Sequence, residues 1–184
     1  GSLVPRQRLE MVKNAAYWDP ARIPKTDRLV LLPIPDASTR VAALLSGQVD
    51  WIEAPPPDAV PRLRASNVQI VTNTYQHTWP WVLNLNAGSP FADIRVRKAI
   101  NLGIDREAIC TMLGGFGTPA VGQVPPGHPW FGNPSFRIRH DPEEAKRLLA
   151  EAGFGPRKPV EAKIIISASG SGQMQPMMMN EAIQ

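Results

Sequence analysis

The chain has 184 residues, of which 43% are hydrophobic and 20% are charged, as in an ordinary globular protein. Its formal charge of +4 does not indicate a nucleic-acid partner, because the basic residues are scattered and the one tight cluster, Arg95, Arg97 and Lys98, has acidic neighbours. The single cysteine, Cys110, excludes an intrachain disulfide and a cysteine-based metal site. The longest uncharged apolar run, residues 29–35, is too short to cross a bilayer.

The N-terminal part predicts two strands followed by a helix. Side chains alternate over residues 7–12 with the period of a strand. Residues 28–34 form a continuous apolar run of strand length, which is typical of a sheet covered on both faces. Asp36 offers N-cap chemistry for a helix with an apolar stripe at helical spacing, and Gly47 ends that helix.

The middle of the chain predicts short strands and one short helix. A strand is expected at residues 49–52, and a helix opens at the proline run 55–57 and continues to about Ala65. Residues 68–74 and 79–86 are each expected to form a further strand.

The C-terminal half predicts a helical region that ends in a strand, a loop and a final helix. One helix starts at Asp93 and another at Asp105, and the long stretch 114–136, rich in Pro and Gly, is expected to be irregular. A third helix has Asp141 as its N-cap and stops at Gly153. The pattern then predicts a strand at 162–167, a polar loop at 167–172 and a helix over 174–184.

Three ordered stretches carry a resemblance to a known family. They read STRVAALLSGQVD at residues 38–50, NLNAGSPFADIRVRKAINLGIDREAI at 84–109, and DPEEAKRLLAEAG at 141–153. Together they resemble the extracellular solute-binding proteins that serve ATP-driven importers of dipeptides, oligopeptides and nickel. The resemblance implies an α/β fold class, namely a fragment of the two-lobe periplasmic-binding-protein type II fold, with mixed sheets flanked by helices.

The same resemblance implies how the chain is divided between the lobes. Residues 1–82 are expected to belong to the first lobe and residues 83–184 to the second, ligand-binding lobe, which is truncated at its C-terminus. The chain starts at Gly1 without a signal segment and stops within a helical pattern at Gln184, so we expect an internal fragment of a longer protein.

Catalytic and metal-binding motifs are not found in the sequence. His77, His128 and His140 lie far apart and have no carboxylate partner at metal-ligand spacing. Nucleophile-elbow, zinc-protease and phosphate-loop sequences do not occur. The sequence therefore predicts a protein that is not an enzyme and that has no cofactor and no metal site.

An aromatic segment over residues 75–81 is the first candidate for a ligand-binding wall. His77, Trp79 and Trp81 lie in it, and Asn84 follows at the expected crossing between lobes. Trp79 and Trp81 share a strand face by parity. Packing between the lobes is the alternative role of this pair, and one tryptophan could be core while the other lines the cleft.

A polar loop over residues 167–173 is the second candidate. Its backbone amides and the N-terminus of the following helix can hold a carboxylate or another anion. Ser169, Gly170 and Gln173 are the expected ligand-binding residues here. The resemblance places this loop where peptide-binding members carry a basic residue for the ligand carboxylate, and this chain has no Arg or Lys there.

The resemblance implies the solute-binding component of an ABC importer. Such a protein captures a peptide or another small polar solute between its lobes and delivers it to permease subunits in the membrane. Its expected location is periplasmic or extracellular and membrane-anchored, without a nucleic-acid partner. A ligand-sensing or interaction module that keeps the fold but does not transport is the alternative.

Overall fold

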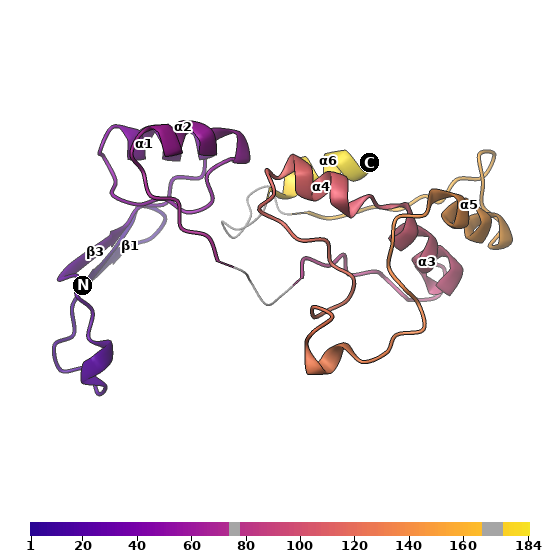
Figure 1. The fold of residues 1–184 in the computed structure, drawn as a ribbon, viewed down its shortest axis with the longest axis horizontal. Coiled ribbons are helices and arrows are strands. Elements are labelled where there is room, and N and C mark those ends of the chain that lie inside the picture. Colours follow the sequence, from indigo (N-terminus) through magenta and orange to yellow (C-terminus); the bar gives the residue numbers. More distant parts are fainter. Residues whose placement is uncertain (74–77, 167–174) are drawn as a thin grey trace. The chain divides into compact units, whose positions relative to one another are not determined.

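The computed structural model describes residues 1–73, 78–166 and 175–184 (Figure 1). The chain divides into two compact units, Gly1–Pro55 and Pro56–Gln184. The first unit contains a small sheet and one α-helix, and the second contains the other α-helices. The lobe boundary expected after residue 82 stays a prediction, because a lobe is defined by the solute cleft that it borders.

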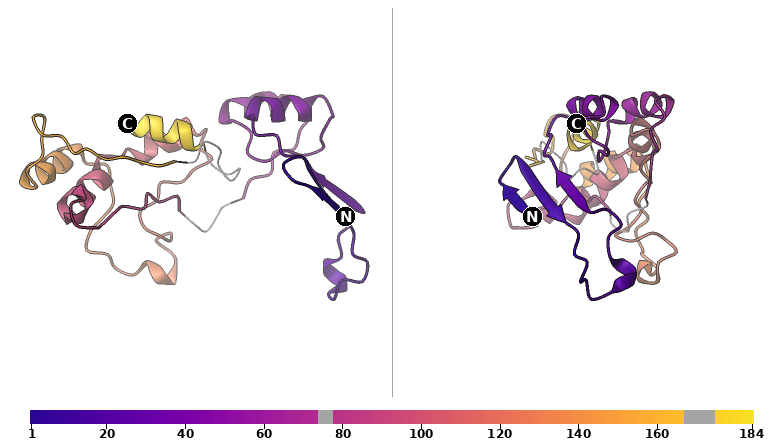
Figure 2. Two further views of the ribbon diagram at one scale, coloured as in Figure 1. Left: turned by 180° about the vertical axis from the view of Figure 1, so that it is seen from behind. Right: turned by 90° about the vertical axis from the view of Figure 1, so that its left-hand side faces the viewer.

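The first unit is built on a three-stranded antiparallel sheet of order β1–β2–β3 (Figure 2). Its strands are β1 (Ser2–Val4), β2 (Arg8–Val12) and β3 (Arg28–Leu31). The register pairs Leu3 with Leu9 and Leu9 with Leu31, so these leucines form one row across the sheet. On the opposite face Glu10 lies 2.6 Å from the guanidinium groups of both Arg8 and Arg28.

Two of these strands confirm the strands predicted at 7–12 and 28–34. β3 ends at Leu31, before the predicted end of the strand. Pro33 has no N–H, so it cannot donate the backbone hydrogen bond that would continue the pairing of β3 with a neighbouring strand.

Helix α1 (Ala37–Leu45) follows the sheet and begins at the predicted cap. The carboxylate of Asp36 accepts a hydrogen bond from the Thr39 N–H at 2.7 Å and two more from nearby hydroxyls. These bonds hold the pKa of Asp36 at about 2. The Arg40 guanidinium donates to the carbonyl oxygens of Ile34 and Pro35, each at 2.8 Å, which fixes the turn from strand to helix.

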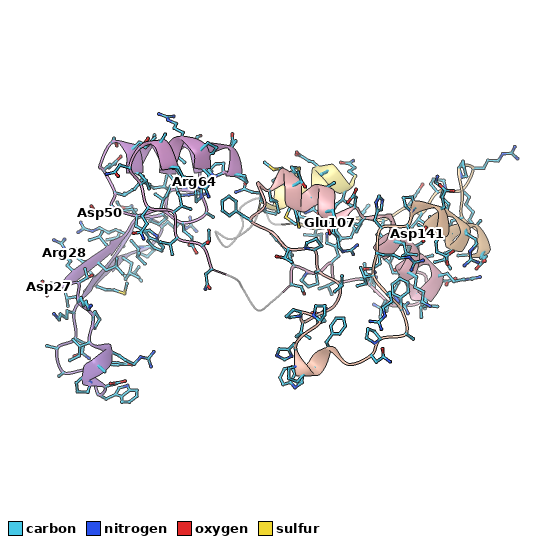
Figure 3. The ribbon with its side chains drawn as sticks, in the orientation of Figure 1. Asp27, Arg28, Asp50, Arg64, Glu107 and Asp141 are labelled. Atoms are coloured by element: carbon cyan, nitrogen blue, oxygen red, sulfur yellow. The ribbon has the colours of Figure 1, made fainter. Side chains whose placement is uncertain are left out.

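The second unit consists of short helices joined by irregular segments. Its elements are η2 (Pro57–Ala59), α2 (Val60–Ala65), η3 (Pro90–Ala92), α3 (Ile94–Gly103), α4 (Arg106–Met112), η4 (Pro129–Phe131), α5 (Pro142–Glu151) and α6 (Pro176–Ile183). Asp93, Asp105 and Asp141 cap α3, α4 and α5 through their carboxylates, and Figure 3 shows Asp141 at the start of α5. Every α-helix predicted from the sequence is therefore confirmed, within a few residues at its ends.

The core of this unit lies between α3 and α5, which pack side by side (Figures 1 and 2). Leu102 is fully buried and packs with Ala99, Ala145 and Leu148, while Phe136 and Leu149 cover the cluster. The Asp141 N–H also donates to the Leu102 carbonyl oxygen at 2.8 Å, so a backbone bond joins the two helices at the same level.

The predicted strands at 49–52, 68–74, 79–86 and 162–167 are wrong wherever the structure describes them. The described residues of these segments have no regular secondary structure, and Val82 and Ile165 expose 94% and 98% of their surface. A strand forms only when a neighbouring backbone takes up its hydrogen bonds. In the described ranges such pairing is confined to β1–β3, apart from one isolated bridge between Gly155 and Lys158.

Candidate functional site

The predicted ligand-binding residues fall into two groups with respect to the described structure. Trp79, Trp81 and Asn84 are described, whereas His77 and the loop residues Ser169, Gly170 and Gln173 lie outside the described residues. The structure therefore describes the parts of the chain next to the undescribed residues of the two candidate segments.

Trp81 lies against helix α6. Its indole N–H donates to the Oδ1 atom of Asn180 at 3.1 Å, and both side chains are half-buried. α6 begins at Pro176, three positions after the end of the predicted polar loop at 167–173. The end of the aromatic segment therefore contacts α6, although the two bonded residues are 99 positions apart in the sequence.

Thr78 connects the aromatic segment to the long irregular stretch 114–136. Its hydroxyl donates to the Oε1 atom of Gln123 at 3.4 Å, and both side chains keep access to solvent. The sequence predicted that this stretch is irregular, but nothing in it singled out Gln123. A long proline-rich loop is a general indication of function or packing, and it does not show which residue faces a neighbouring segment.

The two tryptophans differ in their surroundings. Trp79 exposes 42% of its surface, whereas Trp81 is half-buried with its indole N–H satisfied. Asn84 is exposed, and its Oδ1 atom accepts from the Asn86 N–H at 3.1 Å, which forms a local turn. The structure thus gives Trp81 a partner on α6 and gives Asn84 a role in the backbone turn.

The arginines of the 84–109 motif bind backbone carbonyls within the fold. Arg95 forms an ion pair with Asp93 at 2.6 Å and also donates to the carbonyl oxygen of Glu151 at 2.6 Å, joining the start of α3 to the end of α5. Arg97 donates to the carbonyl oxygens of Phe91 and Ala92. These arginines therefore stabilise the turn and the helix pair.

The shifted carboxylates of this unit are explained by helix capping and surface ion pairs. The Arg95 guanidinium and N–H hold the pKa of Asp93 at about 2. The Glu144 N–H, with help from Arg139, lowers the pKa of Asp141. Burial raises the pKa of the Cys110 thiol, which disfavours the reactive thiolate. None of these shifts has the direction of a general base or a nucleophile prepared for catalysis.

The described part of the chain contains neither a metal-ligand cluster nor a membrane-spanning helix. Across residues 1–73, 78–166 and 175–184, no three His, Cys, Asp or Glu side chains gather in a way that could hold a metal ion. No helix in those same ranges combines the length and the apolar character needed to span a bilayer.

The described structure thus places the 84–109 motif on the α3–α5 helix pair and holds Trp81 against α6. The whole chain, residues 1–184, matches the family model described as bacterial extracellular solute-binding proteins, family 5 Middle. The chain belongs to this family, as its motifs predicted. Members of this family are binding proteins rather than enzymes.

Individual relatives agree with this assignment. The chain is 34% identical to heme-binding protein A of Haemophilus influenzae over 151 residues, which cover 80% of the chain and 27% of that protein. It is 29% identical to the periplasmic oligopeptide-binding protein OppA of Escherichia coli over 177 residues, which cover 90% of the chain and 32% of OppA.

A solved structure confirms the fold class. The murein tripeptide binding protein MppA of Escherichia coli superposes with a TM-score of 0.70 at 32% identity, covering 86% of this chain and 32% of MppA. The predicted α/β fold of a periplasmic-binding-protein fragment is therefore confirmed. The chain spans between 27% and 32% of the length of these relatives.

Proposed function

We propose that this chain is part of the solute-binding component of an ABC importer. The protein captures a peptide or another small polar solute between two lobes and delivers it to permease subunits in the membrane. The observation that carries the proposal is the match of residues 1–184 to the solute-binding family, and the Trp81–Asn180 hydrogen bond supports the choice of site because it holds the aromatic segment against helix α6. Family membership supplies the transport context.

The class of solute follows from the chemistry of the two segments and from the relatives. Tryptophan faces stack on planar or apolar groups, and backbone amides at a helix start hold an anionic or polar group. The relatives are named for heme, oligopeptides and murein tripeptide. A peptide-like solute with a free carboxylate fits both segments, with amides taking the place of the basic residue that residues 167–173 lack.

The proposed contacts with the solute come from both segments. His77, Trp79, Trp81 and Asn84 supply the aromatic wall and its polar end, and Ser169, Gly170 and Gln173 supply the polar loop. Gln123 joins them as a neighbour of Thr78. Residues 1–82 belong to the first lobe and residues 83–184 to the second, so a solute that touches both stabilises the closed form. Docking to the permease takes place on the periplasmic or extracellular side of the membrane.

Binding by the full-length protein tests this function. Trialanine, glutathione, murein tripeptide and hemin are titrated by calorimetry, and native mass spectrometry detects any solute retained through purification. We expect micromolar or tighter binding of at least one probe, or a retained solute, together with a shift in tryptophan fluorescence. If no probe binds and no solute is retained, the proposed function is refuted.

Variants locate the site once a probe binds. Gly170→Val should weaken binding by about tenfold or more if the loop amides hold the solute, since a branched side chain obstructs close approach to the backbone. Trp79→Ala and Trp81→Ala show whether each tryptophan lines the solute site or packs in the core. If both variants lower stability and neither changes affinity, the aromatic pair is core and the site assignment is wrong.

A further inference from the structure

Asn180 uses both halves of its side-chain amide. The Nδ2 group donates to the carbonyl oxygen of Pro176 at 2.7 Å, one helical turn earlier, and the Oδ1 atom accepts from the Trp81 indole N–H at 3.1 Å. The first bond orients the amide on its own helix. The Oδ1 atom then points at the indole N–H, so neither polar end of Asn180 rotates freely.

The position of Asn180 on α6 is unusual for a polar residue. Pro176, Met179 and Ile183 are spaced at helical intervals with Asn180, and all four side chains are buried or half-buried. Met177, Met178 and Glu181 lie on the exposed side instead. Asn180 is thus the polar residue of an inward, otherwise apolar face, and a polar group at such a position is costly unless it is hydrogen-bonded.

From this geometry we infer that Asn180 is a positioning residue, which holds the Trp81 indole in the orientation that lines the solute site. The inference rests on the proposed function for the role of Trp81, but the contact itself does not. An indole fixed before the solute arrives loses less conformational freedom on binding, and affinity is correspondingly higher.

Helix α6 acts on the aromatic wall through Asn180. α6 starts at Pro176 and holds Trp81 through Asn180, one turn after its start. A change in Asn180 therefore acts on the aromatic wall through this hydrogen bond. Its effect on solute binding passes through Trp81 and disappears when the indole donor is removed.

Nuclear magnetic resonance of the full-length protein, labelled with ¹⁵N-tryptophan, tests the contact without any solute. The Trp81 indole signal is the one lost in Trp81→Phe. We expect Asn180→Leu to shift this signal and to speed its exchange with solvent about fivefold, the effect of losing one hydrogen bond. Asn180→Asp keeps an acceptor for the indole but loses the donor to the Pro176 carbonyl oxygen, so its Trp81 indole should exchange more slowly than in Asn180→Leu. Glu181→Leu adds a similar apolar group at the adjacent exposed position and serves as the matched control.

An unmoved Trp81 signal in Asn180→Leu overturns the inference. If that variant does not fold, the unsubstituted protein decides. Its Trp81 indole should exchange more slowly than those of Trp18 and Trp130, which are 78% and 85% exposed. Equal exchange rates would also overturn the inference.

Solute affinity separates this inference from the proposed function. With trialanine or glutathione as the probe, Asn180→Leu should weaken binding about fivefold, and it should have no further effect in a Trp81→Phe background. A shifted indole signal with unchanged affinity in both single variants would leave the contact standing and would refute the assignment of Trp81 to the solute site. An additive effect in the double variant would refute positioning through Trp81.

Discussion

Replacing Leu102 with alanine tests whether the α3–α5 pair depends on one buried side chain. Leu102 is fully buried between Ala99, Ala145 and Leu148, and its backbone carbonyl accepts from the Asp141 N–H. The substitution removes side-chain carbons and leaves that backbone bond possible. The change in stability therefore measures the packing of the Leu102 side chain and not the backbone hydrogen bond between Asp141 and Leu102.

The magnitude follows from the atoms removed. Leucine to alanine deletes three carbons, each worth about 0.8 kcal/mol of transfer free energy, or about 2.4 kcal/mol together. The cavity left behind adds about 1 kcal/mol, because the short neighbours Ala99 and Ala145 have few atoms that can relax into it. We expect the opening free energy of the α3–α5 pair to fall by about 3 to 4 kcal/mol.

Hydrogen exchange with mass spectrometry on the full-length protein measures this loss locally. Peptides that cover α3 and α5 should exchange about a hundredfold or more faster in Leu102→Ala, since each 1.4 kcal/mol is about a tenfold change. Ile94→Ala is the matched control on the same helix, because Ile94 is 54% exposed. If the two variants speed exchange equally, or if Leu102→Ala speeds it less than about threefold, the packing argument is wrong.

Two further predictions concern the ends of α3 and α5. Arg95→Met should raise the pKa of Asp93 from about 2 toward 3.8, as measured by carboxyl titration in nuclear magnetic resonance. An unchanged pKa would mean that the backbone N–H bond at position 95 alone sets it. Because folding lowers the pKa of Asp93, the cap of α3 contributes its full stability above pH 3.8 and loses it as the pH falls toward 2. Hydrogen exchange of the α3 amides should quicken in that pH window. If the cap is lost at a higher pH, the assignment to Asp93 is contradicted. Gly153→Ala should destabilise the end of α5 by about 1 kcal/mol, because Gly153 has φ of 83°, while Gly103→Ala within α3 should be neutral or stabilising. Equal thermal shifts in the two glycine variants would argue against the left-handed turn.

Local chemistry allowed the helices to be predicted from the sequence alone. Asp36, Asp105 and Asp141 each accept from an N–H three residues ahead, so the cap is contained in one short stretch of chain. The family motifs are local in the same sense, since Arg95 and Arg97 bind groups at the helix start that they belong to. These short-range bonds do not depend on distant segments, unlike the bond from Arg95 to the Glu151 carbonyl oxygen, and the sequence determined them together with family membership.

The strands and the candidate site depended on distant parts of the chain. Residues 79–86 and 162–166 have the apolar pattern of strands but form none, because pairing requires a second backbone that the pattern cannot specify. Parity placed Trp79 and Trp81 on one face and could not distinguish their roles. Only the tertiary structure showed that Trp81 is bonded to Asn180, since a contact between residues 99 positions apart is decided by packing and leaves no local pattern in the sequence.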